Sequence, residues 1–195
     1  MSSIKDKIKL SEHAFSEMMW PIIKDQMGGG RIVSVESVTD FDFFKQYLDA
    51  YGGIDSWHID ETRCLMRGLS TRMQQTKKIF HTITIRFRRP SGMPTEIDKR
   101  IRALQEPGNW LHPSLIVQGY FTPGYTEPKA VAIARMEDVI KVVRDGKRGT
   151  SYRDPGDWYV DSTSQKWGNN DNTEFAVIPL ESLSRSGCKM FWKEM

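Results

Sequence analysis

Two consecutive segments of this chain alternate apolar and polar side chains, and this two-residue period constrains the fold most because it is typical of half-buried β-strands. In the segment 64–74 one side carries Leu65, Leu69 and Met73, and the other carries Ser70, Arg72 and Gln74. The segment 81–89 sets Ile83, Ile85 and Phe87 against Thr82, Thr84, Arg86 and Arg88. We therefore predict two neighbouring strands, each with a buried face and a polar, cationic face.

A third strand is predicted before these two, and a helix after them. The segment 52–60 would place Asp55, Trp57 and Ile59 on one face and Ile54, Ser56 and His58 on the other. The segment 95–104 has Thr95 and Asp98 at the spacing of a capping box, which favours a helix start. Its predicted apolar stripe is Ile97, Ile101 and Leu104, and its predicted exposed cations are Lys99, Arg100 and Arg102.

The rest of the chain reads as further helices and strands. Predicted helices cover 10–27, 39–53 and 136–146, and predicted strands cover 31–37, 114–121 and 130–136, with a strand and a short helix over 175–187. The first helix should be disturbed at Pro21 and stopped by the three glycines at 28–30. The polar run 146–173 is too long for a simple connector. It is either a functional loop or an extra hairpin around 158–160.

These elements predict an α/β fold. We expect a mixed central sheet with a three-stranded meander, a crossover helix and a fourth strand, flanked by helices. A chain of 195 residues is long enough for one domain with a substantial core. We expect a helical and strand extension over residues 1–38, followed by a single domain over 39–195 that contains the long loop 146–173.

Charge is concentrated in one part of the chain. The net charge is only +3. Between Arg86 and Arg102, however, the sequence has six cations and only two acids, Glu96 and Asp98. The cations are Arg86, Arg88, Arg89, Lys99, Arg100 and Arg102. Guanidinium groups bind phosphate oxygens in a bidentate fork. We therefore expect these six residues to bind nucleic-acid phosphates, whereas the alternative is a solvated face with salt bridges to local acids.

Cysteine content and hydropathy indicate the cellular compartment and the class of protein. The two cysteines, Cys64 and Cys188, are too few and too far apart for a disulfide framework or a zinc site. A reducing cytoplasm is therefore the expected location. No apolar run approaches the length of a membrane span, and the N-terminal residues lack the apolar core of a signal peptide. We expect no membrane partner.

The order helix, three strands, helix, strand between residues 39 and 121, together with Gly53, Ile54 and Asp55, resembles the PD-(D/E)XK, or restriction-endonuclease-like, nuclease superfamily. The resemblance implies that Asp55 is the metal-binding aspartate. On the next strand the family has an acid or glutamine, one residue and a lysine. Here Arg72 and Gln74 supply related chemistry in the inverted order.

The resemblance assigns a role to each of these residues. Asp55 would bind Mg²⁺, or Mn²⁺, Gln74 would complete or orient the metal shell, and Arg72 would replace the lysine in stabilising charge. A second carboxylate could come from Glu36, Asp60 or Glu61. The alternative is structural: Asp55 would cap a turn after two glycines, and Gln74 would only form a hydrogen bond across the sheet.

Two further groups of residues have less specific patterns. His58, His81 and His112 have no partner at the spacing of a metal motif and are interpreted as structural. The long loop interleaves aromatic residues with cations, namely Tyr152, Trp158, Tyr159 and Trp167 with Lys147, Arg148, Arg153 and Lys166. Such a loop can stack bases beside phosphate contacts, or it can be an outer hydrophobic cluster that pins an insertion.

Together these patterns predict a nucleic-acid-binding protein that acts as a metal-dependent DNA phosphodiesterase, an endonuclease-type hydrolase. DNA is the expected substrate in preference to RNA. The rival hypothesis is a catalytically inactive protein of the same fold that binds DNA or a protein partner, as would suit a phage or mobile-element product. A third class, an enzyme for a small anionic metabolite, would place the same arginines in a closed pocket. The sequence leaves open whether the chain forms a homodimer.

Overall fold

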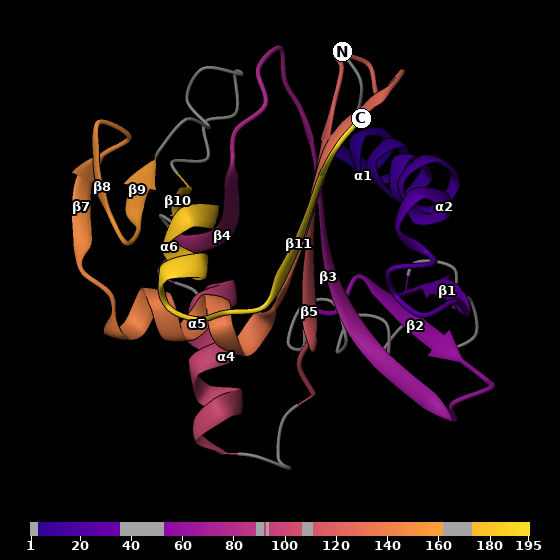
Figure 1. Ribbon diagram of the computed structural model, residues 1–195, viewed down its shortest axis with the longest axis horizontal. Coiled ribbons are helices and arrows are strands. Elements are labelled where there is room, and N and C mark those ends of the chain that lie inside the picture. Colours follow the sequence, from indigo (N-terminus) through magenta and orange to yellow (C-terminus); the bar gives the residue numbers. More distant parts are fainter. Residues whose placement is uncertain (1–3, 36–52, 89–91, 93, 107–110, 162–172) are drawn as a thin grey trace. The chain divides into compact units, whose positions relative to one another are not determined.

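The structure is a computed structural model that describes residues 4–35, 53–88, 92, 94–106, 111–161 and 173–195 (Figure 1). The chain divides into two compact units. Unit 1 comprises Met1–Phe80, Pro113–Ile133 and Phe191–Met195, and unit 2 comprises His81–His112 and Ala134–Met190. The predicted single domain over 39–195 stays a prediction beside this division, and each unit is described by itself. Within the described residues, no helix has the length and apolar character needed to cross a membrane.

Unit 1 begins with one long helical segment. It runs through α1 (Ile4–His13), a π-helical turn η1 (Ala14–Met19) and α2 (Trp20–Ile23). Proline has no N–H and its ring crowds the preceding turn, so the wider π-helical turn lies just before Pro21. The predicted disturbance is therefore present. Three glycines with φ of 90°, 88° and 81° follow, a conformation that side chains with a Cβ rarely adopt.

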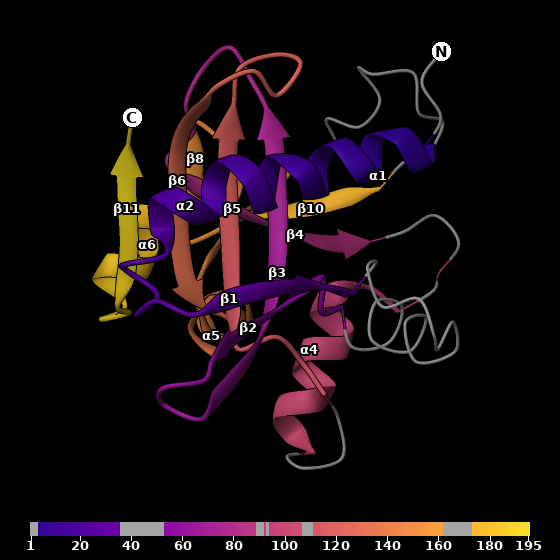
Figure 2. The ribbon, with the colours of Figure 1, turned by 90° about the vertical axis from the view of Figure 1, so that its right-hand side faces the viewer.

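The helical segment covers one face of a six-stranded mixed sheet (Figure 2). Its strands are β1 (Arg31–Ser34), β2 (Ser56–Asp60), β3 (Leu65–Gln75), β5 (Leu115–Phe121), β6 (Pro128–Arg135) and β11 (Met190–Glu194), in the spatial order β1-β2-β3-β5-β6-β11. The core between helix and sheet is apolar and includes Phe15, Met19, Ile23, Leu69, Met73, Val117 and Phe121. The predicted buried face of the β3 segment is thus the face that the helix covers.

The predicted α/β class and mixed sheet are confirmed, but the composition of the meander differs from the prediction. The antiparallel meander consists of β1, β2 and β3. The segment predicted as its third strand, β4 (Thr82–Arg88), pairs instead with β10 (Glu174–Pro179) in a separate sheet of unit 2. Strand β5 then lies parallel to β3, as expected for the strand after a crossover. The short segment after the glycines, and not the 81–89 segment, completes the meander.

Unit 2 is built on the three-stranded sheet β4-β10-β9, in which β9 is Tyr159–Asp161. Three helices pack with it: α4 (Glu96–Gln105), α5 (Met136–Asp145) and α6 (Leu180–Arg185). A two-stranded hairpin, β7 (Arg148–Ser151) and β8 (Asp154–Gly156), follows α5. The buried residues are mainly aliphatic and include Ile83, Ile85, Ile97, Val139, Ile140, Ala176, Ile178 and Leu183. The alternation predicted for the 81–89 segment is therefore present in β4.

Candidate functional site

Asp55, the predicted metal ligand, lies immediately before β2 and is fixed to both neighbouring strands. Its backbone N–H donates to the Leu69 carbonyl at 2.9 Å, and its carbonyl accepts from the Val35 N–H at 3.0 Å. The carboxylate Oδ2 accepts the backbone N–H of Thr71 at 2.6 Å. A side-chain oxygen therefore takes the position of a ladder acceptor and holds the carboxylate against β3, next in sequence to Arg72.

The alternation predicted around Asp55 is present, although β2 begins later than predicted, at Ser56. Ile54, Ser56, His58 and Asp60 are buried, and Asp55, Trp57 and Ile59 are half-buried. The Asp55 N–H bonds to the carbonyl of Leu69, although Leu69 is already the register partner of Ser56, so the ladder is irregular at the start of β2. Ile54 packs with Val35 and Trp57. The burial pattern therefore agrees with the predicted faces, while the pairing with β3 is irregular at Asp55.

Arg72 and Gln74 lie on the face of β3 that points away from the helical core. Their register partners on the parallel strand β5 are Gln118 and Tyr120. Both side chains are half-buried. The Gln118 side-chain amide also donates to the Arg72 carbonyl at 3.3 Å, which ties β5 to β3 at this point. The structure therefore places Arg72 and Gln74 on one face, with the Asp55 carboxylate bonded to the residue before Arg72.

The donor types near Asp55 suit a hard cation with few protein ligands. Magnesium keeps several waters and is commonly bound by one or two carboxylates together with substrate phosphates. Asp55 and Gln74 would offer one carboxylate and one amide oxygen. Among the residues that the structure describes, no group of three His, Cys, Asp or Glu side chains could hold a metal ion. A shared ion stays a prediction, and Glu36 lies outside the described residues.

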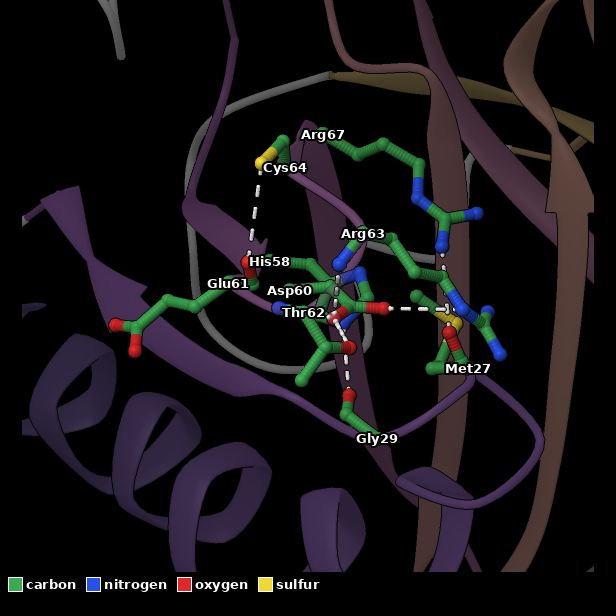
Figure 3. Close-up of polar contacts among 9 residues, drawn as sticks. All are labelled: Met27, Gly29, His58, Asp60, Glu61, Thr62, Arg63, Cys64 and Arg67. Carbon is green, nitrogen blue, oxygen red and sulfur yellow. Dashed lines mark hydrogen bonds and ion pairs between the residues drawn. The ribbon is translucent and has the colours of Figure 1, made fainter.

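Asp60, considered above as a second carboxylate, has a structural role at the far end of β2 (Figure 3). It is 1% exposed, and its Oδ1 accepts the Thr62 hydroxyl at 2.6 Å, the Thr62 N–H at 3.1 Å and the Arg63 N–H at 3.2 Å. The Arg63 guanidinium lies 3.4 Å from Oδ2. The hydrogen bond from the Thr62 hydroxyl, then the contacts with Arg63, lower the pKa of Asp60. The other nearby acid, Glu61, pairs with Arg31 at 3.0 Å.

His58 fastens the glycine turn to the sheet (Figure 3). Its Nε2 lies 2.9 Å from the Gly29 carbonyl, and because a carbonyl only accepts, Nε2 carries the proton. The ring also lies 5.3 Å from that of Trp20. Arg67, the register partner of His58, donates to the Met27 carbonyl at 3.2 Å. These contacts agree with the structural interpretation of His58.

The two arginines predicted to bind phosphate from β4 are each paired with a carboxylate inside unit 2. Arg86 Nη1 lies 3.6 Å from Glu96 Oε1, and the Arg86 backbone N–H donates to Glu96 Oε2 at 3.2 Å. Arg88 Nε lies 3.6 Å from Glu174 Oε2. A phosphate at either guanidinium would meet the negative charge of the resident carboxylate. Arg89 lies outside the described residues.

Helix α4 begins as predicted, but its buried face differs. The capping box of Thr95 and Asp98 is complete. The prediction that Arg100 is exposed is wrong, because this residue is 1% exposed and lies on the buried stripe with Ile97 and Ala103. The three residues follow one another at i, i+3 spacing, so the buried face is rotated from the predicted one. Arg100 is therefore unavailable to phosphate, whereas Arg102 is exposed and Lys99 half-buried.

The described part of the long loop forms the β7-β8 hairpin and β9. Trp158, between them, is 6% exposed and lies 5.4 Å from the ring of Phe87. The Arg148 guanidinium carbon lies 5.5 Å from the Phe87 ring and 5.4 Å from the Trp158 ring. An aromatic cluster thus pins the base of the hairpin, as one of the two interpretations expected. The contribution of Phe87 was not predicted, because it comes from the buried pattern of β4.

Comparison with protein-family models, with curated proteins and with solved structures finds no match to this chain. The resemblance to the PD-(D/E)XK superfamily therefore stays a prediction. The strand order on which it rests differs in the structure, because β4 lies in another sheet, and residues 39–52 of the predicted helix lie outside the described residues.

Proposed function

We propose that this chain binds DNA and that the segment of β3 beside Asp55 is a metal-dependent phosphodiesterase site. The observation that supports this proposal best is the 2.6 Å hydrogen bond from the Thr71 N–H to the Asp55 carboxylate. It fixes a carboxylate next to a strand whose following residues are Arg72 and Gln74. A carboxylate and an amide oxygen can ligate magnesium, and a guanidinium can stabilise negative charge on a phosphate.

In this proposal each residue acts on the phosphate or on the ion. Asp55 and Gln74 would hold magnesium, which when bound would polarise a phosphate oxygen. The Thr71 N–H fixes the carboxylate in position. Arg72 binds a phosphate oxygen and stabilises the negative charge that develops on it. Because arginine stays protonated, it does not serve as a general base.

The alternative function is binding of DNA without cleavage. The specific observation in its favour is that β3 has no lysine: Arg72 would take the lysine's role from the inverted position, and arginine stays protonated. Under this alternative Asp55 acts only as the acceptor for Thr71. The two functions share the binding step and differ in the need for a metal ion.

Substitution of Asp55 by asparagine separates these functions. Asparagine keeps an oxygen acceptor for the Thr71 N–H but removes the charge that binds a cation, so the fold should survive. We expect cleavage of a DNA duplex with magnesium or manganese by the unsubstituted protein and its loss in Asp55→Asn, with Ser70→Ala on the same face as the control. DNA that is bound but never cut by the unsubstituted protein would favour the alternative. Equal cleavage by the Asp55→Asn variant would rule out the proposed role of Asp55.

A further inference from the structure

The cations of the β7-β8 hairpin differ from those of β4 in their partners. Lys147, Arg148 and Arg153 are exposed, and within the described part of the chain none of them forms an ion pair with a carboxylate. Two of them lie over aromatic rings instead. The hairpin therefore keeps cationic groups that a phosphate can approach without displacing an acid.

The acidic residues of the hairpin and of the segment after it form contacts within unit 2. Asp157 Oδ2 accepts the backbone N–H of Lys147 at 2.8 Å, and its Oδ1 lies 3.3 Å from the Arg185 guanidinium. Asp154 Oδ2 accepts the Thr150 hydroxyl at 3.3 Å. Each of these carboxylates is thus used to hold the hairpin or to pair with Arg185. The side-chain charges of Lys147 and Arg153 are left to interact with a partner.

The tip of the hairpin presents an exposed aromatic side chain beside a cation. Ser151 and Asp154 are register partners, so Tyr152 and Arg153 form the two-residue loop between β7 and β8 (Figure 1). Tyr152 is 68% exposed. Arg153 Nε donates to the Tyr152 hydroxyl at 2.8 Å, and its guanidinium carbon lies 5.5 Å from the ring centre. The pair offers a flat aromatic and guanidinium surface to solvent.

The base of the hairpin is held by several contacts within unit 2. Arg148 lies over the Phe87 and Trp158 rings, and the Gly149 N–H donates to the Trp158 carbonyl at 2.8 Å. The Trp158 indole N–H donates to the Gly146 carbonyl at 3.4 Å. The base of the hairpin is anchored while its tip is exposed. Such an anchored base reduces the entropy that a partner must remove when it binds the tip.

We propose that the β7-β8 hairpin binds single-stranded nucleic acid, with Tyr152 stacked on an unpaired base and Lys147 and Arg153 in contact with phosphates. The chemistry favours this partner because every base has a π-face for an aromatic ring, and phosphates match the unpaired cations. A paired base within a duplex has both faces covered by its neighbours. The inference rests on the proposed function in that both require nucleic-acid binding, but it concerns a different surface.

The expected size of the effect follows from the stacking of bases on aromatic side chains. Removal of one stacking residue weakens single-strand binding by about 5- to 150-fold. Tyr152→Ala should therefore weaken binding within this range. Tyr152→Phe keeps the ring and should bind within about twofold of the unsubstituted protein. Neither substitution removes a buried group, so both proteins should fold.

The experiment measures binding of the full chain to a fluorescently labelled oligothymidine of about ten nucleotides, a length within the site sizes typical of such proteins. Fluorescence anisotropy at low salt gives the dissociation constants of Tyr152→Ala, Tyr152→Phe and Lys147→Gln/Arg153→Gln. Lys24→Gln, at an exposed lysine of unit 1, serves as the control for the loss of a positive charge. We expect loss of affinity in the Tyr152→Ala and double variants, with Tyr152→Phe and Lys24→Gln retaining it.

The outcomes separate this inference from the proposed function. Oligothymidine binding that is equal in Tyr152→Ala and in the unsubstituted protein would overturn the role of the hairpin and leave the proposed function standing. Equal loss of affinity in Lys24→Gln and in the double variant would also overturn it, by showing that positive charge acts without a defined site. Hairpin-dependent binding of oligothymidine by a protein that never cuts DNA would support the inference and contradict the proposed cleavage.

Discussion

Arginines on β4 and arginines on the β7-β8 hairpin belong to the same unit but have opposite surroundings. Arg86 and Arg88 alternate with apolar residues on a strand and each meets a glutamate at 3.6 Å. Arg148 and Arg153 belong to a hairpin and lie over aromatic rings at about 5.5 Å. Within the described residues, only the first pair has carboxylate partners. A count of cations along the sequence therefore overestimates the positive charge that a phosphate can reach on β4, and it underestimates the positive charge that a phosphate can reach on the hairpin.

The difference shows that available charge depends on residues distant in sequence. Glu174 lies on β10, far along the chain from Arg88, and reaches it only because β10 pairs with β4. Glu96 reaches Arg86 because α4 packs against β4. Among the described residues the hairpin cations form no ion pair, because Asp157 pairs with Arg185 and the Asp154 carboxylate accepts the Thr150 hydroxyl. Substitutions can test this contrast between anchored and exposed groups, and between paired and unpaired cations.

The largest expected effect separates the base of the hairpin from its tip. Trp158 is buried against Phe87, so Trp158→Ala should lower the free energy of unfolding by about 3–5 kcal/mol. Tyr152→Ala should change it by less than about 0.5 kcal/mol, because the side chain is exposed. Denaturant unfolding followed by far-UV circular dichroism measures both. Comparable losses in the two variants would mean that the tip is part of the fold and not a free binding surface.

A second comparison concerns two arginines of α4 that the sequence pattern does not distinguish. Arg100 is buried and Arg102 is exposed. Arg100→Ala should lower the free energy of unfolding by about 2–5 kcal/mol through the cavity it leaves. Arg102→Ala should change it by less than about 0.5 kcal/mol. If Arg100→Ala unfolds at the same denaturant concentration as Arg102→Ala, the assigned rotation of α4 is incorrect.

Asp60 in unit 1 is an anchored carboxylate, in contrast to the exposed groups of the hairpin. The turn after β2 holds its side chain, and its pKa is lowered. A carboxyl group whose pKa is lowered in the folded state stabilises the fold at pH values above the ordinary aspartate pKa. This stabilisation is lost as pH falls through the folded-state pKa. Thr62→Ala removes the largest cause of the shift, so the pKa of Asp60 should rise and acid unfolding should begin at higher pH. Thr62→Ser keeps the hydroxyl and serves as the control. Identical acid transitions in both variants would contradict the role of the hydroxyl.

The smallest expected effect is that of removing the carboxylates that pair with the β4 arginines, which would leave these arginines, like those of the hairpin, without an ion pair among the described residues. Glu96→Gln and Glu174→Gln remove the charges that pair with Arg86 and Arg88. A surface ion pair contributes up to about 1 kcal/mol, so each of the two substitutions alone should raise DNA affinity by no more than about fivefold. A mobility-shift titration at fixed salt measures the gain. Weaker binding after both substitutions would show that the glutamates do not compete with phosphate.

Local patterns allowed much of the secondary structure to be predicted, because their causes lie within a few residues. The alternation in β4, the capping box of α4 and the disturbance at Pro21 all follow from neighbouring side chains. Strand pairing is decided by distant segments, so the sequence pattern predicts the wrong sheet for β4. A segment of alternating residues is equally suited to either sheet, and only the packing of the whole chain selects its partner.

The candidate site shows the same division. Arg72 and Gln74 share a face because alternation within β3 is a local property. Alternation also predicts the face of Asp55, but the hydrogen bond from the Thr71 N–H to its carboxylate could not be predicted, because it depends on the irregular pairing between β2 and β3. The burial of Arg100 escaped prediction because charged residues are ordinarily assigned to the exposed face of a helix. The role of Phe87 beneath Arg148 required the hairpin to fold back onto β4.

The salt dependence of oligothymidine binding tests most directly whether the hairpin cations, and not those of β4, contact phosphates. Each phosphate contact to a single strand contributes about 0.7 to the slope of log K against log salt. The Lys147→Gln/Arg153→Gln variant should therefore lose about 1.4 from the slope of the unsubstituted protein, and Arg86→Gln/Arg88→Gln should leave it unchanged. An unchanged slope in the hairpin variant, together with a reduced slope in the β4 variant, would contradict the account.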